Sequence, residues 1–153
     1  MCPINELYQK HVDLALQEKQ DEDHNLLNKD KIHQKILAFL SEVGKLSEES
    51  RCFSFWDSSP SDNQELLSFY INGLQLVLSI GYDLKIDSIH QSLPINQKND
   101  LISQFLKVYD TILLMQKSYR FEDYQKVIDD YITLGFLLQF DIDEIIQAYK
   151  ENV

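Results

Sequence analysis

The chain has 153 residues, of which 44% are hydrophobic and 25% charged, a length and composition that fit one globular domain over 1–153. Its net charge of −11 argues against nucleic acid or an anionic membrane as a partner, because both attract basic patches. The two cysteines are too few for a disulfide scaffold, and no run approaches about 20 apolar residues. We therefore expect a cytoplasmic protein.

The pattern of apolar residues predicts helices throughout. From 5 to 17 the apolar face is imperfect, whereas from 32 to 46 apolar residues recur at spacings of three and four, which is one helical face. The next helix is apolar nearly all round, with Ser61 or Asp62 as its N-cap and Gly81 where a C-terminal glycine would stand. Three later helices follow, the last capped by Asp141. The expected ranges are 5–17, 29–51, the Ser61/Asp62 cap to 81, 97–117, 121–138 and 142–150.

The connections are polar or rich in turn residues. They cover 18–25, 57–62 and 83–94, and with only 4 glycines and 3 prolines in the chain few other breaks are expected. No alternating strand pattern and no internal repeat is present. The sequence therefore predicts an all-α protein, a bundle of about five to six helices.

Three separated blocks carry a resemblance to a known family. Residues 35–56 read K-I-L-A-F-L-S-E-V-G-K-L-S-E-E-S-R-C-F-S-F-W. Residues 66–81 end with G-L-Q-L-V-L-S-I-G, and residues 134–149 begin with L-G and end with E-I-I-Q-A-Y. In this order the blocks resemble the dimeric dUTPases, which belong with the MazG-like enzymes to the all-α NTP pyrophosphatases. The resemblance implies that fold, a homodimer and dUTP diphosphatase activity.

The family resemblance also implies a magnesium site. The family carries E-x-x-E on one helix and E-x-x-D on the next, so that four carboxylates hold Mg²⁺ against the substrate phosphates. Here the first position is Glu42, which matches the family. The other three are Lys45, Phe69 and Asn72. The resemblance thus leaves Glu42 as the one metal ligand, and Mg²⁺ is expected only if the protein is active.

The implied nucleotide pocket is altered too. The family's His-Phe pair after the second motif corresponds to Gln75 and Leu76, so an aromatic side chain that would stack on uracil is missing. The family's N-terminal Gln has no clear counterpart, although Gln9 and His11 lie nearby, and its basic C-terminal tail has none. Arg51, Phe55 and Trp56 are retained and are candidates for the pocket. Lys45 and Asn72, which replace two of the carboxylates, are further candidates. For Trp56, packing within its aromatic cluster is the alternative interpretation.

These substitutions lead to three hypotheses for function, and none assigns a catalytic residue. The first is a dUTPase-like protein with hydrolysis lost or impaired, which binds a uracil nucleotide or has a regulatory role. The second is an active dUTP or nucleoside triphosphate diphosphatase that recruits other carboxylates, such as Glu48, Glu49 or Glu65. The third is an acidic homodimer that serves a protein partner.

Overall fold

A computed structural model describes the chain except for residues 1–2, 19–27, 57–58, 91–99 and 153, and within the described part it is helical without a strand. This confirms the predicted all-α class. The predicted connections at 19–25, 57–58 and 91–94 lie outside the described residues. The described helices are α1 (Pro3–Glu18), α2 (Asn28–Ser50), α3 (Asn63–Asp83), α4 (Leu101–Ser118), α5 (Phe121–Leu137) and α6 (Ile142–Glu151).

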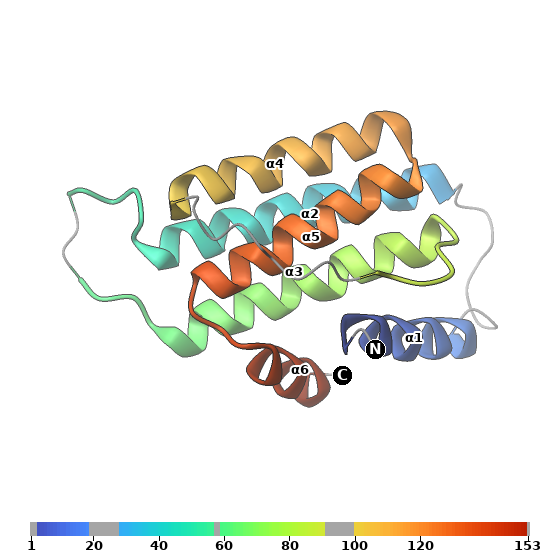
Figure 1. Ribbon diagram of the computed structural model, residues 1–153, viewed down its shortest axis with the longest axis horizontal. Helices are drawn as coiled ribbons and strands as arrows, with labels where there is room; N and C mark the ends of the chain where they lie inside the picture. The colour runs from blue at the N-terminus through green and yellow to red at the C-terminus, as the bar shows by residue number, and fades with distance from the viewer. Residues whose placement is uncertain (1–2, 19–27, 57–58, 91–99, 153) are drawn as a thin grey trace.

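Four long helices form the body of the molecule. The antiparallel pairs α2–α3 and α4–α5 make the most extensive contacts, and α2 also packs on α4 and α3 on α5 (Figure 1). The shorter α1 and α6 pack against α3 and against each other. The apolar face predicted over 32–46 points into the core, where Phe39, Val43 and Leu46 are fully buried. No described helix has the length and apolar character needed to cross a membrane.

At two of the predicted positions an aspartate caps the start of a helix. Asp62, rather than Ser61, caps α3, since its carboxylate accepts from the backbone N–H groups of Gln64 (2.9 Å) and Glu65 (3.3 Å). Asp141 caps α6 in a reciprocal capping box with Glu144, as predicted. Both caps satisfy backbone donors that a helix leaves unpaired at its first turn.

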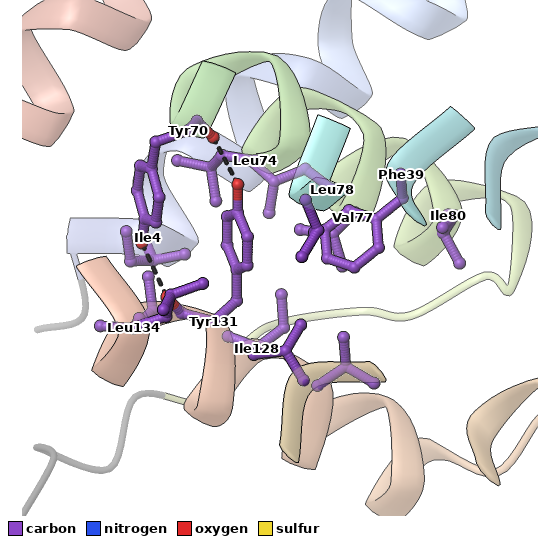
Figure 2. Packing of buried hydrophobic residues seen from close by; sticks show 14 of the residues in the cluster. Ile4, Phe39, Tyr70, Leu74, Val77, Leu78, Ile80, Ile128, Tyr131 and Leu134 are labelled. Carbon is purple, nitrogen blue, oxygen red and sulfur yellow. Dashed lines mark hydrogen bonds between the residues drawn. The ribbon is translucent and has the colours of Figure 1, made fainter. Parts of the chain in front are cut away.

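A buried tyrosine pair joins α3 to α5. The rings of Tyr70 and Tyr131 stack with centroids 4.5 Å apart and an interplanar angle of 1°. Each hydroxyl donates to the other residue's backbone carbonyl, Tyr70 at 3.0 Å and Tyr131 at 2.7 Å (Figure 2). A Cβ on Gly73 would overlap the Tyr131 hydroxyl, and one on Gly135 would overlap the Tyr70 ring. We call these four residues the Tyr–Gly interface.

Gly81 does not end its helix, so that part of the prediction was wrong. α3 continues to Asp83, and the left-handed residue is Lys85 (φ 61°). Gly81 instead makes room for the ring of Tyr124, whose hydroxyl donates to the Val77 carbonyl at 2.8 Å. The glycine is therefore a packing residue, which local sequence does not distinguish from a C-cap.

Other helix ends differ from the prediction by a few residues. α2 stops at Ser50 because Arg51 takes the left-handed conformation (φ 62°). The predicted start of the fourth helix, at 97, lies outside the described residues. At Asp100 the backbone is still extended, and the Asp100 carboxylate caps α4 by accepting from the Ser103 N–H at 2.7 Å. This N-cap was missed because no apolar periodicity marks it.

Candidate functional site

The face of α2 that lies against α3 is defined by three side chains seven residues apart. Lys35 forms an ion pair with Asp83 on α3 (Nζ–Oδ2 2.6 Å), and Glu49 accepts a hydrogen bond from the backbone N–H of Asp62 (3.1 Å). Glu42 lies midway between Lys35 and Glu49 on the same helical face. Since the helices are antiparallel, Glu42 is level with the middle of α3, between Asp62 and Asp83.

On α3 the middle of that span contains Phe69 and Asn72, the two further positions that the resemblance predicts for metal ligands. Phe69 is seven residues after Asp62 and fourteen before Asp83, and Asn72 follows Phe69 by about one turn. Both are half-buried, and Phe69 packs against the core. Glu42 and Lys45 therefore belong to α2, and Phe69 and Asn72 to α3, which packs against it; we call these four residues the ligand face.

An ion pair occupies the α2 side of the ligand face. Lys45 Nζ lies 3.3 Å from Glu42 Oε1; the lysine side chain is 52% exposed and the glutamate 16%. The second Glu42 oxygen is buried, with no hydrogen-bond partner among the residues described. Glu42 also lies close enough to Tyr131 to help raise the pKa of that phenol, after burial and Tyr70 as the larger causes.

The donor set of the ligand face does not fit Mg²⁺. This ion takes hard oxygen ligands in an octahedral arrangement and binds mainly through carboxylates. The ligand face offers one carboxylate, already paired with an ammonium, and the neutral amide of Asn72, while a phenyl ring stands at the third position. Within the part of the chain that the structure describes, no other group of three or more His, Cys, Asp or Glu side chains could hold a metal ion.

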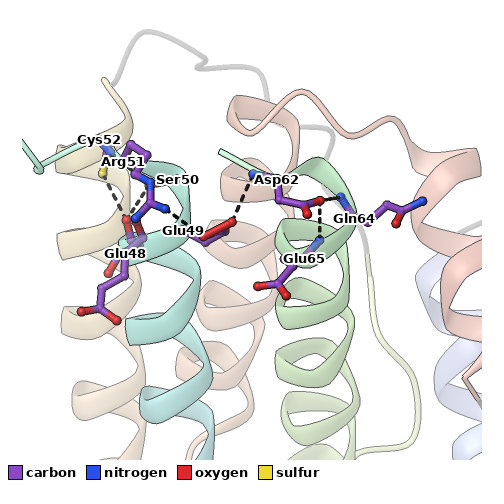
Figure 3. Close-up of polar contacts among 9 residues, drawn as sticks. Glu48, Glu49, Ser50, Arg51, Cys52, Asp62, Gln64 and Glu65 are labelled. Carbon is purple, nitrogen blue, oxygen red and sulfur yellow. Dashed lines mark hydrogen bonds and ion pairs between the residues drawn. The ribbon is translucent and has the colours of Figure 1, made fainter. Parts of the chain in front are cut away.

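Arg51 lies at the turn that follows α2. Its guanidinium contacts Glu49 (Nη2–Oε2 3.6 Å) and the Glu48 carbonyl (3.5 Å), both on the last turn of its own helix (Figure 3). Glu49 in turn binds the start of α3 through Asp62. Through the contacts of Glu49 with Arg51 and with the Asp62 N–H, the end of α2 is linked to the start of α3.

The aromatic residues after Arg51 form an exposed cluster. Phe55 is 94% and Trp56 68% exposed, and their rings meet edge to face at 4.8 Å. Phe53 contacts the Trp56 ring at 6.0 Å. Trp56 thus contacts the rings of Phe53 and Phe55, while the cluster remains outside the core and largely exposed to solvent.

The remaining pocket residues are placed differently from one another. Gln75 and Leu76 are half-buried on α3. The Gln9 amide donates to the Asp87 carbonyl at 2.9 Å, so this side chain fastens α1 to the segment after α3. Gln9 is therefore engaged away from the ligand face.

A hollow of about 620 Å³ that sequence reasoning missed opens near the first turn of α3 and the α5–α6 turn. Leu66, Leu67 and Leu101 supply apolar lining, and Asn63, Gln64 and Glu144 supply polar groups. None of the predicted site residues lines it. It had no signal in the sequence because its walls come from segments far apart in the chain.

The comparisons with known proteins agree with the blocks found in the sequence. A family model described as dUTPase matches residues 4–152, which is nearly the whole chain. The search of curated proteins gave no match, and neither did the search of solved structures. The matched range includes every residue of the ligand face and the aromatic cluster.

Proposed function

Since the chain belongs to the dimeric, all-α dUTPase family, we propose that it binds a uracil nucleotide without hydrolysing it. The observation that carries the proposal is the ion pair between Lys45 and Glu42, which stands where the family places two metal-binding carboxylates. Phe69 and Asn72 are neutral, so the ligand face as a whole carries no net negative charge. The family's chemistry depends on Mg²⁺ to orient water and to offset phosphate charge, and this donor set does not fit that ion.

The side chains that remain support binding better than hydrolysis. The Lys45 ammonium is half-exposed and can attract a phosphate as a point charge. The rings of Phe55 and Trp56 are open to solvent and can cover a base or sugar. A regulatory or sensing role follows if the nucleotide is bound and retained.

The test is pyrophosphate release from dUTP in the presence of Mg²⁺. We expect the purified protein to give no release above a blank, because it lacks three of the family's carboxylates. Magnesium-dependent turnover would overturn the proposal. A titration with dUMP then measures nucleotide binding separately, and its absence would leave a protein-interaction role as the better explanation.

A restored site provides the matched variant. The substitutions K45E/F69E/N72D return the family's carboxylates, and we expect calorimetry to detect divalent-metal binding that the wild-type protein lacks. The control K45Q/F69Q has side chains of similar size without the negative charge and should bind no metal. Failure of the restored variant to bind metal, while folded, would show that the ligand face is not the family's metal site.

Other carboxylates are poorly placed to replace the missing ones. Glu49 is held by Arg51 and by the Asp62 N–H, while Glu48 and Glu65 are exposed. The hypothesis of an active enzyme with unusual ligands is therefore the weaker alternative. If that hypothesis holds, Mg²⁺ is the expected cofactor.

The acidic homodimer is favoured by a separate observation, the exposed leucines on α2 and α4. We propose that the protein is a homodimer, as the family implies. We also propose that each chain forms one domain and that the protein is cytoplasmic. A sedimentation mass close to that of one chain (18.0 kDa) would contradict the dimer.

A further inference from the structure

An exposed apolar surface runs along α4 and the neighbouring part of α2. Leu113 and Leu114 on α4 are 45% and 48% exposed, and Leu37 on α2 is 71% exposed. Leu106 and Ile102 continue the surface toward the start of α4. Large exposed apolar side chains that gather in one place mark interaction surfaces more often than scattered ones do.

Two hydrogen bonds fix how these leucines lie relative to each other. The Tyr109 hydroxyl donates to the Leu40 carbonyl (3.3 Å), and His33 Nε2 lies 2.6 Å from the Tyr119 hydroxyl. Since α2 and α4 are antiparallel (Figure 1), Leu37, which is midway between His33 and Leu40, is level with the middle of the 109–119 segment. Leu37, Leu113 and Leu114 therefore form one patch, which we call the α4 patch.

The charge of α4 suits a second copy of this chain. Two copies with a net charge of −11 each repel one another unless the contact avoids acidic surface. α4 carries two lysines, Lys107 and Lys117, against one acidic residue, Asp110. Among the described helices it is the one with a net positive charge.

Asp110 and Lys117 are also arranged for two-fold pairing. They are exposed, seven residues apart on the same helical face, with the leucines of the α4 patch between them. Neither forms an ion pair with another described residue. In a symmetric dimer the same patch faces itself, so an antiparallel pair of α4 helices sets each Asp110 opposite the partner's Lys117.

We infer that the α4 patch is the self-association surface of this protein, with two α4 helices antiparallel about an axis near Leu113. The inference rests on the homodimer proposed above and adds the surface and the register. Leu37, Leu113 and Leu114 form the apolar centre, and two Asp110–Lys117 pairs flank it.

Charge reversal tests the register. Sedimentation velocity at low ionic strength, over a series of concentrations, should show that D110K raises the dimer dissociation constant about tenfold, because the substituted side chain then sets a second ammonium against the partner's Lys117. The double variant D110K/K117D should return it to near the wild-type value. D110K also reduces the overall negative charge of the chain, so a general electrostatic effect would strengthen the dimer instead. The matched control D13K, on the exposed face of α1, should not weaken it.

An apolar substitution tests the surface independently of the register. Leu37→Glu should raise the dissociation constant at least about a hundredfold, since a charge would be buried at the centre of the contact. Leu37 is exposed in the protomer, so the variant should keep its helical circular dichroism. Leu16→Glu, at an exposed leucine of α1, is the control and should stay dimeric.

The outcomes separate the two proposals. A wild-type protein that sediments as a monomer at all concentrations overturns the homodimer and the α4 patch together. A wild-type dimer that persists in Leu37→Glu overturns the α4 patch alone. A dimer weakened by Leu37→Glu but not by D110K, or not rescued in the double variant, overturns the antiparallel register. Nucleotide binding is measured separately and is affected by none of these results.

Discussion

The Tyr–Gly interface and the ligand face both involve α3 but differ in how completely their buried polar atoms are hydrogen-bonded. At the Tyr–Gly interface both buried hydroxyls have carbonyl partners, and both glycines admit a ring that any side chain would displace. At the ligand face Glu42 keeps a buried oxygen without a partner among the described residues, beside a half-exposed lysine.

The packing of the Tyr–Gly interface therefore stabilises the fold, whereas the fold does not depend on metal-binding residues at the ligand face. A buried polar group without a partner costs free energy, so the Tyr–Gly interface tolerates little change. The ligand face carries a lysine and two neutral residues at positions that the resemblance predicts for metal-binding carboxylates, and the helices still pack. We therefore expect perturbations of the two regions to differ in size, and the following measurements test this.

Alkaline pH should have the largest effect, because it acts on all the buried tyrosines together. Burial raises the pKa of Tyr70, Tyr124 and Tyr131 well above the ordinary value and that of Tyr8 and Tyr149 to about 12. In the unfolded chain these phenols ionise near pH 10. Above that pH the unfolded state binds fewer protons than the folded state, so stability is complete below about pH 10 and falls as pH rises further.

Each fully buried tyrosine then lowers the free energy of unfolding by about 1 kcal/mol for every pH unit above 10. We expect urea midpoints to fall steeply between about pH 10 and pH 11, with phenolate absorbance from the core appearing only with loss of helical circular dichroism. If the buried tyrosines ionised near pH 10 while the protein stayed folded, the packing described for the Tyr–Gly interface would be contradicted.

Two glycine-to-alanine substitutions should change the free energy of unfolding by an intermediate amount, one lowering it and the other raising it. Gly73→Ala forces a Cβ into the Tyr131 hydroxyl and should lower the free energy of unfolding by about 1–3 kcal/mol. Gly44→Ala, on α2, places its Cβ 3.6 Å from the Tyr109 hydroxyl, an ordinary contact. It should raise stability by up to about 1 kcal/mol through helix propensity.

Urea unfolding at one protein concentration checks both glycine variants. Equal effects at Gly73 and Gly44 would mean that the close approach of Tyr131 does not constrain the fold.

The smallest effect is expected at the ligand face. Lys45→Ala removes an ion pair whose lysine is half-exposed, and such i,i+3 pairs contribute about 0.2–0.5 kcal/mol. Thermal melting should therefore change little. A loss of stability above about 1 kcal/mol would show that the Lys45–Glu42 pair contributes more than an exposed ion pair within one helix, and would contradict the expected difference between the two regions.

Sequence alone determined the helices and their family, for physical reasons that are local. Apolar spacing of three and four marks a buried helical face, so 32–46 was identified correctly. A cap acts on backbone N–H groups within three residues, so Asp141 was identified and the cap of α3 was narrowed to Ser61 or Asp62. The dUTPase family was identified because the three sequence blocks occur in the family's order, and this order can be read directly along the chain.

Only the tertiary structure decided which distant groups meet. The reciprocal Tyr70–Tyr131 contact joins residues 61 positions apart, and nothing local distinguishes Gly81 beside Tyr124 from a helix-ending glycine. Likewise, the sequence only predicted that Lys45 stands at a ligand position of the family. Its pairing with Glu42 at 3.3 Å and the exposure of Phe55 and Trp56 depend on how α2 and the turn after it pack. Helix periodicity fixes which residues face inward, whereas the partner that each one finds depends on the docking of whole helices.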